Sequence, residues 1–230
     1  LPRRGDDARL EHVLPSTEPV ADVREFSLTP GTRFSTRCGG LFLFLPDLVR
    51  LDLDALAARA KLPGSRMVTA SHALRCALSL KLWSVERKSH VMALVADPGL
   101  ALFSGLNVIP KKSFMCEYSS RVERSRSLAL LAAWHAGVGG DGLFDAGSFN
   151  LDFHSVPYYG EDAQVQSHFV SARSRSQPSV LAFLAQDAGG RAFCYSNADL
   201  RKGEEAREIF SFIEFWRREH DADTRTFWMR

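Results

Sequence analysis

The sequence lacks features that mark several classes of protein, beginning with closely spaced cysteines. Its four cysteines are scattered, with no CxxC pair and no histidine at zinc-finger spacing: Cys38, Cys76, Cys116 and Cys194. Scattered thiols argue against a disulfide framework and a structural zinc site, and they fit a reducing, cytoplasmic environment. The longest apolar run, Leu41 to Leu45, is far too short to cross a bilayer, so we expect no membrane partner.

Charge of one sign is not in excess either, because the formal net charge of the 230 residues is only +2. Any basic surface for nucleic acid must therefore come from local clustering. No HxH or HExxH spacing supports a zinc site, and no GxSxG motif supports a serine hydrolase. The composition is that of an ordinary globular protein with one large domain or two small ones. Leu at the first position, in place of Met, leads us to expect a fragment or a processed start.

The first part of the chain predicts a lead-in followed by helices. Residues 1–35 are rich in charge and proline, which is typical of a poorly ordered segment. Residues 36–140 carry apolar side chains at helical spacing, with Ser65 or Thr69 as a helix cap. The last of these helices is expected to be long, covering residues 112–138.

The last part, residues 141–230, changes to a strand pattern and a final helix. Apolar runs and alternation predict three strands, at residues 148–156, 179–187 and 192–197. The turn from Asp187 to Gly190 joins the second and third strands as a hairpin, and residues 202–220 predict an amphipathic helix. We therefore expect an α+β or α/β protein, in which a helical region precedes three strands and a helix that form an incomplete sheet.

The first predicted strand carries the strongest candidate for a functional residue. In the stretch FNLDFHSV, apolar and polar residues alternate, which places Asp152 and His154 on one face of the strand. The simpler interpretation is a half-buried strand whose polar face contacts water. The alternative is a metal-binding carboxylate. In that case Asp152, His154, Glu161 and Asp162 would form the site of a metal-dependent hydrolase.

Basic residues cluster at a few places along the chain. Such groups neutralise phosphates and give salt-dependent, sequence-independent affinity for DNA. The simpler interpretation is that they lie on solvated helix faces. The candidates for DNA contacts are Lys111, Lys112, Arg121, Arg124, Arg173 and Arg175.

Several long phrases of the sequence resemble bacterial insertion-sequence transposases of the DDE class. They are GLFLFLPDLVRLDLDALAARA, SHALRCALSLKLWSVERKSHVM, GLNVIPKKSF, FNLDFHSVPYYGED and LAFLAQDAGGRAFCYSNADLRKGEE, and the resemblance extends from about residue 36 to about residue 220. It implies a DNA-binding helical region at residues 36–140 and a partial RNase H-like catalytic domain at residues 141–230. The partner that it implies is the double-stranded DNA of the element's terminal repeats, in the bacterial cytoplasm at the nucleoid.

The resemblance also implies roles for three residues of the first strand and its turn. Asp152 matches the first catalytic aspartate, which binds Mg²⁺ in this family, and two such ions promote in-line displacement at a phosphodiester. His154 and Tyr158 would support the metal ligands or face the substrate. The family continues with a strand that carries a second Asp and, later, a helix that carries a Glu.

Neither of these later elements is found in this sequence, since Asp221 and Asp223 lie in a polar stretch. We therefore expect a truncated, catalytically incomplete transposase with weak or no Mg²⁺ binding. The strand of Asp152 would then be an exposed edge prone to aggregation. The alternative function is a DNA-binding regulator that recognises element ends without catalysis, alone, as a homodimer or with an intact transposase.

Overall fold

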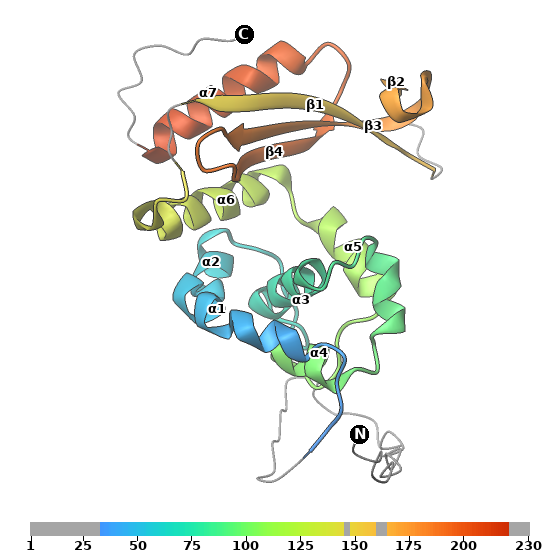
Figure 1. Cartoon of the computed structure of the whole chain (residues 1–230), viewed down its shortest axis with the longest axis vertical. Coiled ribbons are helices and arrows are strands. Elements are labelled where there is room, and N and C mark those ends of the chain that lie inside the picture. The colour runs from blue at the N-terminus through green and yellow to red at the C-terminus, as the bar shows by residue number, and fades with distance from the viewer. Residues whose placement is uncertain (1–32, 145–147, 160–164, 221–230) are drawn as a thin grey trace, which may run out of the picture. The chain divides into compact units, whose positions relative to one another are not determined.

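The computed structural model describes residues 33–144, 148–159 and 165–220, and these form an α+β protein (Figure 1). The described residues divide into two compact units. The helical unit holds residues 33–42 and 64–117, and the sheet unit holds residues 43–63 and the described residues from 118 to 220. Apart from residues 33–35, the predicted lead-in lies outside the described residues.

The helical unit is built from short helices, of which α3 (Ala70–Leu82) and α4 (Pro98–Phe103) begin with a side-chain cap. It also contains the 3₁₀-helix η2 (Lys88–Ala93) and most of α5 (Lys112–Arg121). Of the two predicted caps, Thr69 is the one used, and its hydroxyl accepts a hydrogen bond from the His72 amide. Asp97 caps α4 in the same way, and it also accepts hydrogen bonds from the Thr36 hydroxyl and the Arg37 amide.

The prediction of one long helix over residues 112–138 is wrong, because the helix is interrupted after Arg121. α5 ends there, and α6 (Arg124–Val138) begins after two intervening residues. Glu123 between them has an extended backbone, with φ −63° and ψ 150°, and its carbonyl oxygen accepts hydrogen bonds from the amides of Arg126 and Ser127. The carbonyl of Glu123 therefore starts a new helix in place of continuing the old one.

A second interruption separates α1 (Leu45–Leu51) from α2 (Leu53–Arg59), which follow the 3₁₀-helix η1 (Gly39–Phe44). Asp52 between them adopts the left-handed conformation, with φ 46°, and its carboxylate accepts a hydrogen bond from the Ala55 amide. Asp tolerates this conformation better than most residues because its short side chain bonds locally.

The sheet unit contains four antiparallel strands among its described residues, one more than the sequence predicted. They are β1 (Phe149–Pro157), β2 (Ser167–Val170), β3 (Arg175–Asp187) and β4 (Phe193–Leu200). β3 is central: it pairs with β1 on one edge and with β2 and β4 on the other. The missed strand, β2, has only four residues and pairs with the start of β3. The predicted turn is confirmed, and the Asp187 carboxylate accepts a hydrogen bond from the Gly190 amide within it.

The amphipathic helix predicted at residues 202–220 is present as α7 (Glu205–His220), and it covers one face of the sheet. Its apolar stripe packs against β3 and β4, and Figure 1 shows the helix running along the strands. The centre of this core consists of Phe183, Tyr195, Phe212, Phe215 and Trp216, each at most 3% exposed. Burial of large aromatic side chains is the main source of stability in a core of this kind.

The predicted domain boundary near residue 140 does not coincide with the division into units, because α1, α2 and α6 belong to the sheet unit. α2 packs against α6. The guanidinium of Arg126 donates to the carbonyl oxygen of Lys61 at 2.7 Å, and the Tyr118 hydroxyl donates to the carbonyl oxygen of Pro63 at 2.9 Å. Arg50 forms an ion pair with Asp141 in the 3₁₀-helix η3 (Gly139–Asp141), which follows α6.

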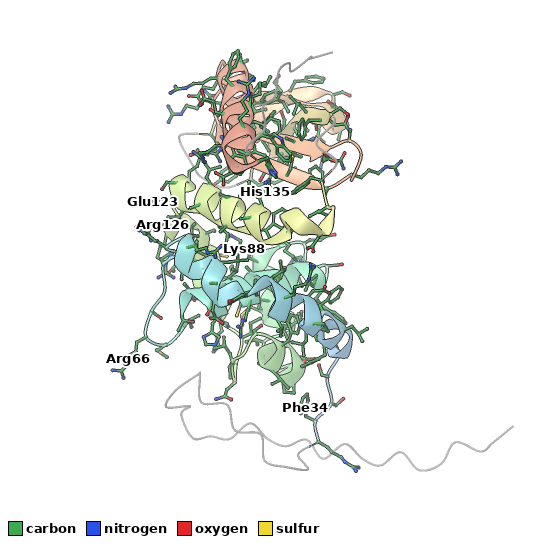
Figure 2. The ribbon with its side chains drawn as sticks, turned by 90° about the vertical axis from the view of Figure 1, so that its left-hand side faces the viewer. Phe34, Arg66, Lys88, Glu123, Arg126 and His135 are labelled. Carbon is green, nitrogen blue, oxygen red and sulfur yellow. The ribbon has the colours of Figure 1, made fainter. Side chains whose placement is uncertain are left out.

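Two histidines meet where α6 approaches α7. His135 of α6 is 1% exposed, and its Nδ1 lies 2.9 Å from Nε2 of His220 in the last turn of α7 (Figure 2 labels His135). Rings of Phe144, Phe215 and Trp216 surround it. Burial, together with the neighbouring His220, lowers the pKa of His135 to about 4. The imidazole is therefore neutral in the folded protein at pH 7.

The buried His135 predicts a loss of stability on acidification. The pKa of this imidazole is lower in the folded than in the unfolded chain, so its contribution is complete above pH 6.5 and falls as the pH drops towards 4. Between pH 7 and pH 5 the free energy of unfolding should decrease by about 2 kcal/mol through this group. Urea unfolding at both pH values measures the change.

His135→Phe should reduce this pH dependence, because it keeps an aromatic ring and removes the titrating group. The matched control is His90→Ala, which removes an exposed histidine and should leave the pH dependence unchanged. Equal pH dependence in wild type and His135→Phe would contradict the prediction.

Candidate functional site

The polar residues of β1 face away from the core, as the alternation predicted. Burial alternates along the strand, so that Phe149, Leu151 and Phe153 are half-buried while Asp152 and His154 are exposed. The half-buried side packs against the aromatic core under α7. The packing of α7 therefore determines which face of β1 presents its carboxylate to solvent.

A hollow of about 260 Å³ lies beside this exposed face. We call it the β1–β2 hollow, because it is lined by residues of β1, of β2 and of the following 3₁₀-helix η4 (Ser171–Arg173). Among its lining residues are Asp152, His154, Phe169 and Arg173. Three of the residues singled out in the sequence thus come together here, and they combine one carboxylate, one imidazole and one guanidinium.

The described residues do not complete a metal site around Asp152. Within residues 33–144, 148–159 and 165–220, no group of three His, Cys, Asp or Glu side chains is placed to hold a metal ion. A two-metal site needs several carboxylates, and Asp152 with the nearby His154 supplies only one. Glu161 and Asp162 of the hydrolase hypothesis lie outside the described residues. Tyr158 follows β1, where its amide donates to the Pro178 carbonyl oxygen, and it is half-buried.

Arg124, one of the candidates for DNA contacts, is engaged inside the sheet unit. Its Nη2 donates to Oε1 of Glu208 at 2.9 Å and to the hydroxyl of Tyr195 at 2.8 Å. The Tyr195 hydroxyl in turn donates to the same carboxylate oxygen at 2.9 Å. The Glu208 side chain is 9% exposed and that of Arg124 is 33% exposed. This triad joins α6, β4 and α7. It gives the Arg124 side chain a structural role that requires no DNA contact.

Sequence reasoning missed this triad because its members are separated by up to 84 residues along the chain. The one available signal was the position of Glu208 near the apolar stripe of α7, where an acid is unusual without a partner. Burial raises the pKa of Tyr195 strongly, so its hydroxyl keeps its proton and remains a donor.

The other basic candidates lie on the surface. Lys111 and Lys112 are exposed at the start of α5, and Arg175 is exposed at the start of β3. Arg121 ends α5, and its guanidinium lies 5.7 Å from the centre of the Tyr118 ring. Arg173 ends η4 at the β1–β2 hollow.

Charge is unevenly divided between the two units. Residues 33–42 and 64–117 of the helical unit contain nine Lys and Arg against three Asp and Glu, a net charge of +6. Eight of the nine basic residues are exposed: Arg33, Arg37, Arg66, Lys81, Arg87, Lys88, Lys111 and Lys112. Figure 2 shows Arg66 extending away from the ribbon. One of the three acids, Asp97, is occupied by its hydrogen bonds as a cap.

Comparison with known proteins gives no relative: no family model, no curated protein and no solved structure matches the chain. Within its described residues, the chain has no helix that is both long and apolar enough to span a membrane. What the site does must therefore be inferred from its residues.

The triad predicts a stability cost when its acceptor is weakened. Glu208→Gln keeps the size of the side chain but leaves the Arg124 guanidinium without its ion pair, and we expect the free energy of unfolding to fall by about 2 kcal/mol. Urea unfolding followed by circular dichroism measures the loss. Glu214→Gln, at an exposed position of the same helix, is the control and should cost less than 0.5 kcal/mol. Equal effects of the two substitutions would refute the structural role of the triad.

Proposed function

We propose that the chain acts on double-stranded DNA as a transposase of the DDE class, with the helical unit binding DNA and the sheet unit forming the first part of an RNase H-like catalytic domain. The observation that carries the proposal is the exposed Asp152 at the middle of β1, in one hollow with His154 and Arg173. In this proposal Asp152 is the carboxylate that this part of the chain contributes to phosphodiester chemistry. Such a protein acts in the bacterial cytoplasm, at the nucleoid.

The order of elements in the sheet unit supports this proposal. β1 is followed by the short β2, by the β3–β4 hairpin and then by α7, and all the strand pairs are antiparallel. The first strand carries its acid on the face that α7 leaves open, which is the position that the resemblance implies for the first catalytic aspartate. An arrangement of strands alone does not establish an activity, so the interaction with DNA has to be measured directly.

The charge of the helical unit supports the DNA-binding part. A net charge of +6 over 64 residues, carried by exposed side chains, is suited to the phosphate backbone. Phosphate contacts of this kind give affinity without sequence information. The net charge of the whole chain does not reveal this basic unit, because the remaining residues carry more acids than bases.

Magnesium enters this proposal as the family's cofactor and not as a site of the described residues. Asp152 supplies one ligand position for such an ion, and no group of three His, Cys, Asp or Glu side chains among the described residues completes the set. The described residues support the binding of DNA more fully than its cleavage. For this reason a DNA-binding regulator, which recognises element ends without catalysis, is the alternative function.

Removal of the paired lysines at the start of α5 tests the helical unit. Lys111→Ala with Lys112→Ala should weaken binding to a fluorescein-labelled duplex of arbitrary sequence, because two phosphate contacts are lost. In anisotropy titrations at several salt concentrations, the slope of log K against log salt should become shallower by about 2. Lys202→Ala with Arg207→Ala removes the same charge near the start of α7 and should leave the slope unchanged. Equal slopes for both double variants and wild type would exclude this contact.

Arg173 tests the β1–β2 hollow separately. Arg173→Ala should reduce the salt slope of DNA binding by about 1 and raise the dissociation constant for every duplex to a similar extent. Arg207→Ala is the single-charge control on α7, away from the hollow. Binding to wild type that does not depend on salt would dismiss the proposal as a whole, whereas an effect of the lysines alone would confine DNA to the helical unit.

A further inference from the structure

The outer edge of β1 has backbone groups available for pairing. β1 pairs only with β3 among the described strands. The even-numbered residues bond towards β3, since the Tyr158 amide donates to the Pro178 carbonyl oxygen and the Ser148 carbonyl oxygen accepts from the Ala188 amide. Successive residues of a strand direct their amide and carbonyl groups to opposite edges. The groups of Leu151, Phe153 and Ser155 therefore point to the open edge.

The sequence of β1 itself lacks the features that usually prevent another strand from pairing. Natural edge strands are short, or carry Lys, Pro, bulges or inward-facing charges that prevent another strand from adding. β1 is nine residues long, pairs with β3 in unbroken register, and contains no Lys or Arg. Its proline is the last residue, Pro157. The only ionisable side chains of the strand are Asp152 and His154, both exposed on the face opposite α7.

We propose that the occupant of this edge is a second copy of the same chain, which pairs its own β1 antiparallel about a two-fold axis at Phe153. This inference goes beyond the proposed function and does not depend on DNA binding. In this register Asp152 lies opposite His154 of the second copy, and by symmetry His154 lies opposite Asp152 of the second copy. Leu151 lies opposite Ser155 of the second copy, and the Phe153 rings meet across the axis.

The charges of the strand select this register over its neighbours. Centring the axis on Asp152 opposes two carboxylates, and centring it on His154 opposes two imidazoles and leaves each Asp152 facing the apolar Val156. Only the register at Phe153 forms two acid–imidazole pairs. Directly opposed residues that exchange no backbone hydrogen bonds have the closest side chains in an antiparallel ladder. Asp152 and His154 occupy such positions, because their own backbone groups bond to β3.

The faces of the two sheets are compatible with this pairing. A two-fold axis perpendicular to the sheet keeps both α7 helices on one side of the joined sheet and both Asp152–His154 pairs on the other. Phe153 is half-buried against the core of its own copy, and pairing would cover its remaining exposed surface. In a two-fold dimer the backbone groups of both β1 edges are paired with each other. No open edge of β1 remains for a third copy, so assembly stops at a dimer.

Sedimentation equilibrium of the full chain at neutral pH tests the inference. We expect a monomer–dimer equilibrium in wild type. In the Asp152→His dimer an imidazole faces an imidazole in both pairs, and in the His154→Asp dimer a carboxylate faces a carboxylate in both pairs. Each substitution should therefore raise the dimer dissociation constant at least tenfold. The exchange of both residues, Asp152→His with His154→Asp, restores the two complementary pairs and should return the dissociation constant to within about threefold of wild type. If the exchange dimerises as poorly as the single variants, the register is wrong.

Ser155→Pro tests the edge independently of charge. Proline removes the Ser155 amide, which points to the open edge, and is tolerated where a strand has no neighbour. It should abolish the dimer while circular dichroism shows an unchanged monomer. Ser155→Ala keeps the amide and should dimerise as wild type does. A wild type that is monomeric at all concentrations, or a dimer indifferent to Ser155→Pro, would overturn the proposal.

Discussion

The packing of α7 on one face of the sheet is the constraint on which the rest of the sheet unit depends. The aromatic stripe that includes Phe212 and Trp216 requires an apolar partner surface, and β3 and β4 supply it. β1 adds its own apolar side to the same core. Because the side chains of a strand alternate between its two faces, the packing of the apolar side of β1 places Asp152 on the solvent-exposed face. A shift of β1 by a single residue would bury a carboxylate against aromatic rings, which is far more costly than any loss of surface contacts.

The two units differ in how they use charge. In the helical unit, basic side chains are exposed and outnumber acids three to one, so their field acts on the surroundings. In the sheet unit, Arg124 is turned inwards to Glu208 and contributes to the attachment of α6. A guanidinium in a tight ion pair uses its charge and its hydrogen-bond donors on its neighbours, so it is poorly suited to bind a ligand as well. Counting basic residues along the sequence could not distinguish these two situations.

The sequence predicted those features of the fold that depend on local chemistry. The alternation around Asp152, the cap at Thr69 and the hairpin turn at Asp187 each follow from a few adjacent residues, and each is present. The sequence did not predict the break at Glu123. The new helix begins there with hydrogen bonds to a backbone carbonyl, and no capping side chain marks its start. Nor did it predict β2, which is too short to show a period and exists because β3 extends beyond β1. Of the candidate site, the residues were predictable, but their meeting in one hollow depends on that missed strand.

Neither unit is a continuous stretch of chain, since residues 43–63 belong with the sheet while the residues before and after them belong with the helical unit. α2 packs against α6, which begins more than sixty residues after α2 ends. A fragment that stopped before α6 would leave α2, with its buried Leu56, without the helix that covers it. The helical unit therefore consists of two segments that meet the sheet unit at three points along the chain, after residues 42, 63 and 117. Exchange of the whole unit between related genes would require a crossover at each of these points, and a single crossover would separate α1 and α2 from the rest of the sheet unit.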